Sequence, residues 1–216
     1  MEETLQEQPR LNFWKMISGT IISPSDTLAM IAQQRPWIAA VSLIVFLEGL
    51  GYVLGGLLPS RDYLSLGITS KSEFSITGMF FEIAYALFRL AVFALLVHGI
   101  VRAWIGQGSY GGVFCALAFS WIPIILLHLL GLLGTSSNLP VLPWPSTLEG
   151  LKNIDVFMLS LTIFIVIWTV TLGIMAIRGT YNLRAMAAVV TYFGAAIIQS
   201  IIFSWGQKVL ELFTKQ

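Results

Sequence analysis

Apolar runs of about 20 residues recur along this chain, and each is long enough to cross the ~30 Å hydrocarbon core of a bilayer. In lipid, backbone N–H and C=O groups must pair within their own segment, so runs of this length form helices. Only 11% of the residues are charged, against about 25% in soluble domains. The sequence therefore predicts an all-α polytopic membrane protein, a bundle of five transmembrane helices. The spans are expected at about 37–58, 79–101, 112–134, 155–177 and 185–205.

Residues 1–36 are expected to form a cytoplasmic N-terminal segment with an amphipathic juxtamembrane helix at 24–34. Ser23 is suited to cap this helix and Pro24 to occupy its first position. The helix should end before Pro36, because proline disfavours the helical conformation in the residue before it. The preceding stretch LNFWKMISGTII is short and amphipathic, which favours a position in the membrane interface.

An odd number of spans places the two termini on opposite sides of the membrane. The basic residues closest to span ends favour a cytoplasmic N-terminus. They are Arg35, Arg102, Arg178 and Arg184. Residues 206–216 are then a short C-terminal tail on the outside. The formal net charge of +1 excludes a strongly basic face for nucleic acid.

Ionisable residues lie inside the apolar runs, where each costs about 2.5–3.5 kcal/mol on insertion scales. With a rise of about 1.5 Å per residue, Glu48 and Arg89 both fall near the midplane, on antiparallel helices. We expect the two side chains to pair directly or through water, since an unpaired buried charge is costly. The alternative is that each one snorkels or meets a backbone carbonyl separately.

Three more polar residues are expected above this pair, towards the outer surface. Glu82 precedes Arg89 by two helical turns and shares its face. His128 and Gln199 fall at a similar depth on other spans. These three residues, together with Glu48 and Arg89, form a candidate intramembrane polar cluster. The cluster would line a cavity open to the outside. The alternative is a static bundle in which they satisfy one another. 

The sequence shows no recognisable motif for catalysis or metal binding. Its two histidines, His98 and His128, fall on different helices at different depths, which argues against a shared metal. His98 is expected at the membrane interface. Cys115 has no activating neighbour, and neither HExxH nor a Ser/His/Asp pattern is present. No catalytic, cofactor-binding or metal-ligating residue is therefore expected, and the protein is predicted not to be an enzyme.

Glycine and proline mark the connection after the second span and the middle of the third. Gly106, Gly108 and Gly111 match a GxGxxG pattern, but dinucleotide binding requires a preceding strand, and here the pattern joins two spans. With Gly112 these residues are predicted to form a tight turn or hinge. Pro123 is predicted to kink the third span.

Three stretches in this order resemble the Yip domain, named for Ypt/Rab-interacting proteins. They are SPSDTLAMIAQQRPW, HGIVRAWIGQGSYGG followed by Pro123, and GIMAIRGTYNLRAMAAVV, within residues 20–205. The resemblance implies five transmembrane helices and a cytoplasmic N-terminus. Eukaryotic members are trafficking factors of the ER and Golgi that bind prenylated Rab-type GTPases and associate with one another. They carry a DLYGP-like motif that this short N-terminal segment lacks, so we expect a prokaryotic member in the inner membrane without GTPase binding.

Two functions remain open at this level. The first is a non-enzymatic scaffold or membrane-organising, trafficking-type factor in the lipid bilayer, with a second copy or another membrane protein as partner. The second is a small transporter or channel-like protein with a polar cavity around Arg89, Glu82, Glu48 and His128. The density of ionisable groups favours transport, whereas the five spans show no inverted repeat of the kind many transporters have.

Overall fold

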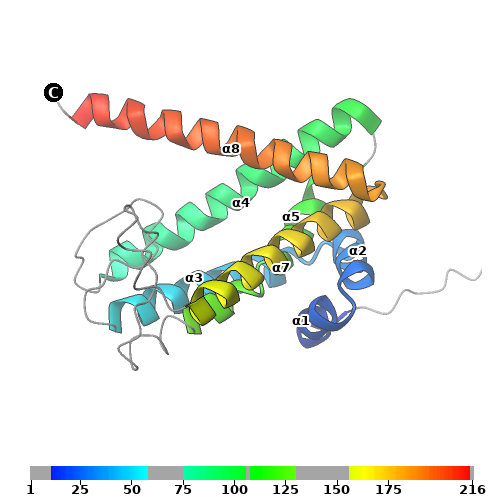
Figure 1. The fold of residues 1–216 in the computed structure, drawn as a ribbon, viewed down its shortest axis with the longest axis horizontal. Coiled ribbons are helices and arrows are strands. Elements are labelled where there is room, and N and C mark those ends of the chain that lie inside the picture. Colours follow the sequence, from blue (N-terminus) through cyan, green and yellow to red (C-terminus); the bar gives the residue numbers. More distant parts are fainter. Residues whose placement is uncertain (1–10, 58–74, 106–107, 130–155, 215–216) are drawn as a thin grey trace, which may run out of the picture.

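The computed structural model describes residues 11–57, 75–105, 108–129 and 156–214 (Figure 1). Within these ranges the chain is helical and contains five helices long and apolar enough to cross a membrane, which confirms the predicted fold class. The helices are α1 (Phe13–Ile22), α2 (Pro24–Gln34), α3 (Trp37–Leu57), α4 (Ile76–Ile105), α5 (Tyr110–Ser120), α7 (Val156–Tyr181) and α8 (Ala185–Thr214). Residues 124–129 are helical again and complete the third spanning segment.

Several helices are longer than the apolar runs that indicate them. α4 begins three residues before the expected start at 79 and ends four residues after 101, so it continues through Arg102 and Trp104. α8 continues to Thr214 and thus takes in most of the segment 206–216. Polar and aromatic side chains at the membrane interface are compatible with a helical backbone, so the end of an apolar run does not end the helix.

The centre of the bundle is α5. Every residue from Gly111 to Ser120 is buried, and α5 packs against α1, α2, α3, α4 and α7. Its sequence YGGVFCALAFS is apolar all round and rich in small residues. A helix without a polar face is suited to a fully enclosed position, and small side chains let neighbouring backbones approach closely.

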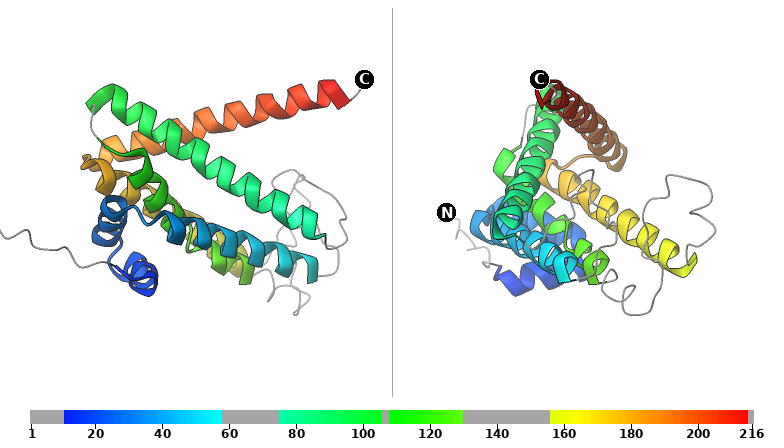
Figure 2. Two further views of the ribbon diagram at one scale, coloured as in Figure 1. Left: turned by 180° about the vertical axis from the view of Figure 1, so that it is seen from behind. Right: turned by 90° about the vertical axis from the view of Figure 1, so that its left-hand side faces the viewer.

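The two N-terminal helices fold over one end of this bundle (Figures 1 and 2). α2 buries Thr27, Leu28, Ile31 and Ala32, and packs against α5 and α7. It is therefore more deeply packed than the helix at the membrane surface that the sequence suggests. Ser23 stands at the N-cap position of α2 but makes no side-chain capping hydrogen bond.

α8 is the least buried of the spanning helices, whereas the segment that contains α5 is the most buried. It packs mainly on α4 and α7, and its C-terminal half extends away from the other helices (Figures 1 and 2). Of the residues in its spanning segment, 17% are buried, against 61% for the segment that contains α5. Most of the surface of its spanning segment, Ala185–Gly206, is thus left for lipid or for another protein.

Candidate functional site

The structure brings two of the predicted cluster residues, Glu82 and Arg89, into electrostatic range of a third, Glu48. Glu48 on α3 interacts with both Glu82 and Arg89 on α4. All three side chains are half-buried. Within the described ranges, no direct ion pair forms between Glu48 and Arg89. The charge interaction that the depths of these residues suggest is therefore present at longer range, between α3 and α4.

The close contacts of Arg89 are instead with Tyr85 on its own helix and with two residues of α8. Its guanidinium carbon lies 5.7 Å from the centre of the Tyr85 ring and 5.9 Å from that of Phe203. Gln199 Nε2 donates a hydrogen bond of 2.7 Å to the Arg89 carbonyl oxygen. Phe203 also makes an edge-on contact with Tyr85, with ring centres 5.8 Å apart. An arginine over aromatic rings gains about 0.5–2 kcal/mol, so this group of contacts ties α8 to α4.

His128 packs against α3 one helical turn after Glu48. Its ring lies against Gly51, where a Cβ atom would come within 2.5 Å of the ring. Gly51 follows Glu48 by about one helical turn. His128 Nε2 is buried without a hydrogen-bond partner among the described residues. The five predicted residues thus meet in separate contacts: Glu48 with Glu82 and Arg89, Gln199 with the Arg89 backbone, and His128 with α3.

A second polar contact, which the sequence does not reveal, lies at the end of the bundle near α2. His98 Nδ1 and the Tyr181 hydroxyl are 2.9 Å apart, which joins α4 to α7. The Tyr110 ring of α5 stands 6.3 Å from the His98 ring. Gly108 has a φ of 119°, and a Cβ atom there would enter the Tyr181 ring. The glycine turn is therefore shaped around Tyr181.

Removing the Tyr181 hydroxyl tests this contact. Tyr181→Phe should lower the free energy of unfolding by about 1 kcal/mol, the usual value of one hydrogen bond, while the ring keeps its packing. Tyr192→Phe is the matched control, because the Tyr192 hydroxyl makes no hydrogen bond with the described part of the chain. Unfolding by SDS in mixed micelles measures both variants. Equal effects of the two substitutions would contradict a stabilising role for the His98–Tyr181 bond.

Gly111 and Gly112, which the sequence predicts in the turn, lie in the first turn of α5, where they let neighbouring elements come close. A Cβ atom on Gly111 would lie 2.7 Å from Trp37 Cζ2, and one on Gly112 would lie 2.6 Å from the carbonyl oxygen of Ala32. Gly106 falls outside the described residues. At Pro123 the helix is interrupted between Ser120 and residue 124, and the Trp121 and Ile122 amides bond three residues back instead of four.

Two features of the described residues bear on metal binding and on the one cysteine. They contain no group of three or more His, Cys, Asp or Glu side chains that could hold a metal ion. Cys115 is completely buried in the middle of α5.

Comparison with known proteins decides the family. The family model of the Yip1 domain matches residues 18–206. The chain belongs to the Yip1 domain family. This match confirms the resemblance based on the glycine turn and its neighbouring stretches, and it takes in α2 and all five spanning segments. No curated protein and no solved structure matches the chain.

Proposed function

We propose that this Yip1-domain protein is a non-enzymatic membrane scaffold that holds partner proteins through helix contacts, with α8 as the principal binding helix. The observation that carries the proposal is the low burial of α8 compared with α5. Membrane helices associate through packing and interhelical hydrogen bonds, and a helix that is mostly uncovered has room for a partner. The partner is a second copy of the chain or another membrane protein.

Cysteine cross-linking in native membranes tests this role. Ile197 on α8 and Ile167 on α7 are equally exposed, at 60% and 59%. In a Cys115→Ala background, Ile197→Cys is expected to cross-link to a partner at least about fivefold more than Ile167→Cys, because a specific interface favours one face over random lipid contact. Equal cross-linking at the two positions would contradict binding through α8.

The membrane orientation belongs to the same proposal. The four arginines that favour a cytoplasmic N-terminus are all exposed at the ends of α2, α4 and α7 and just before α8, which lie at one end of the bundle (Figure 1). We place this end on the cytoplasmic side of a bacterial inner membrane, with the C-terminus outside. A C-terminal epitope tag that is accessible to antibody on intact spheroplasts would support this orientation, and one accessible only after lysis would contradict it.

Transport is the second candidate function, and one observation favours it. Glu48 lies in electrostatic range of both Glu82 and Arg89 inside the spanning segments, where charged residues often mark an ion or substrate path. Flux assays with purified protein in liposomes, across a panel of ions and small solutes, test this function. Transport would be excluded for every solute that wild type fails to carry.

A further inference from the structure

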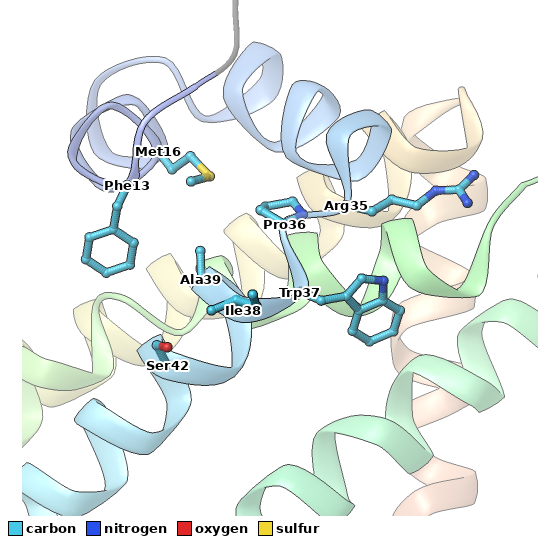
Figure 3. A pocket seen from close by; sticks show the side chains of 8 residues that line it. All are labelled: Phe13, Met16, Arg35, Pro36, Trp37, Ile38, Ala39 and Ser42. Carbon is cyan, nitrogen blue, oxygen red and sulfur yellow. The ribbon is translucent and has the colours of Figure 1, made fainter.

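A groove of about 720 Å³ separates α1 from the beginning of α3. Figure 3 shows Phe13 and Met16 on α1 facing the chain from Pro36 to Ser42 across this groove. The groove is open on one side. Its walls are apolar apart from Arg35 at one end and Ser42 at the other.

The groove runs from the membrane surface into the bilayer. The first spanning segment begins at Trp37, so Arg35 lies at the boundary with water. Ser42 is five residues further along α3, about 7 Å deeper at 1.5 Å per residue. α1 exposes Trp14 and Ile22, with exposed fractions of 74% and 79%, which is typical of a helix lying in the interface. A phospholipid has the same polarity, with its phosphate at the boundary and its acyl chains below.

The charges around the groove favour an anionic lipid. Lys15 and Arg35 are both exposed, and neither makes an ion pair with another described residue. Asp26, at the start of α2, is the one acidic residue between positions 11 and 42. Arg35 lines the water-side end of the groove. In the structure its side chain extends on the far side of Pro36, away from α1, so it reaches a phosphate in the groove only after it turns back past Pro36 (Figure 3).

The backbone at Arg35 supports a use for its side chain. Arg35 ends α2 with φ 50° and ψ 58°, a left-handed conformation. This position at the end of a helix is usually glycine or asparagine, since other residues are strained there. A strained non-glycine residue that persists at such a position is a marker of function.

We propose that the groove between α1 and α3 binds one acyl chain of an anionic glycerophospholipid, with Arg35 holding the phosphate. The inference concerns a lipid site and is independent of the partner contacts of α8. It predicts selectivity for an anionic over a zwitterionic headgroup. It also predicts that the acyl chain of the lipid lies beside Met16 and Ala39.

Photolabelling of the purified full-length protein tests the site. The probes are phosphatidylglycerol and phosphatidylcholine with a diazirine in one acyl chain, each added to detergent micelles. Phosphatidylglycerol should label peptides that contain Phe13–Met16 and Ile38–Ser42. Ala39→Trp and Ser42→Phe, which fill the groove, should reduce this labelling at least about fivefold. Ala84→Trp, on an exposed position of α4, should leave it unchanged.

Arg35→Gly separates a lipid contact from a structural role. Glycine accepts the left-handed conformation without strain, so thermal stability should be retained or increased. The preference for phosphatidylglycerol should fall about fivefold, which corresponds to the ~1 kcal/mol contributed by one Arg near an anionic surface. Arg35→Lys should keep most of the preference.

Three results would overturn the proposal. One is equal labelling by the two lipids in wild type. Another is undiminished labelling in both groove-filling variants, which would place the probe elsewhere. The third is an Ala39→Cys variant that cross-links efficiently to a second copy, since the groove would then hold protein rather than lipid.

Discussion

Replacing Gly112 by alanine is expected to separate α2 from α5 and to lower the free energy of unfolding by about 2 kcal/mol, within the range for overpacked cores. The new Cβ atom would lie 2.6 Å from the carbonyl oxygen of Ala32, which is backbone and cannot rotate away. Relief therefore requires α2 to move as a whole. Since α2 also buries Leu28 and Ile31 completely, its displacement exposes apolar surface that is now enclosed.

The chain provides a matched control for this substitution in Gly99. Gly99 lies within α4, and a Cβ atom there would meet nothing within 4 Å. Gly99→Ala should be neutral or stabilising by up to about 1 kcal/mol, because alanine favours the helix. Gly179→Ala on α7 should have a smaller cost than Gly112→Ala, since its nearest contact, the Ala29 Cβ atom, is 3.1 Å away.

Hydrogen exchange shows whether the loss arises at α2. In Gly112→Ala the amides of residues 28–34 should exchange faster than in wild type, while the amides of α4 keep their protection. Unfolding in SDS micelles gives the corresponding change in free energy. Unchanged protection of α2 together with unchanged stability would show that the backbone contact between Gly112 and Ala32 is not close.

The number of spanning helices follows from the sequence because it depends only on the length of apolar runs and the thickness of a bilayer. The depth of Glu48 and Arg89 follows in the same way from the helical rise. Both quantities lie along the helix axis. They are independent of how the helices pack. The described residues contain the expected number of helices long and apolar enough to cross a membrane.

The direction in which each side chain points around its helix could not be predicted in the same way. The spanning helices are apolar on all sides, so no hydrophobic periodicity marks the face of α4 that meets α8. The contacts of Arg89 with Phe203 and Gln199 therefore have no signal in the sequence. The central position of α5, by contrast, does have a signal in the sequence. The helix is rich in small residues, and serine is its largest polar side chain after Tyr110.

The substitution with the other large effect is Arg89→Ala, which should lower the free energy of unfolding by about 3 kcal/mol, as expected when one side of a buried charge interaction is removed. Two losses combine in it. Glu48 and Glu82 are left without the cation that interacts with Glu48, and the aromatic rings of Tyr85 and Phe203 lose the guanidinium. Unfolding in SDS micelles, with size-exclusion chromatography as the check of fold, measures the change.

A double-mutant cycle separates these two losses. If the interaction with Glu48 dominates, Glu48→Gln should cost little in the Arg89→Ala background and the coupling energy should be about 1–2 kcal/mol, within the range for interacting neighbours. If the contacts with α8 dominate, the two substitutions should be additive, whereas Phe203→Leu should couple to Arg89→Ala. Arg89→Lys keeps the charge but loses the planar stacking over aromatic rings. Its stability should therefore resemble that of wild type only if the interaction with Glu48 dominates. An Arg89→Ala variant as stable as wild type would contradict both, and would show that Arg89 is not part of the structural framework. A charge that the fold does not need would then favour the transport function, and flux through that variant in liposomes becomes the decisive comparison.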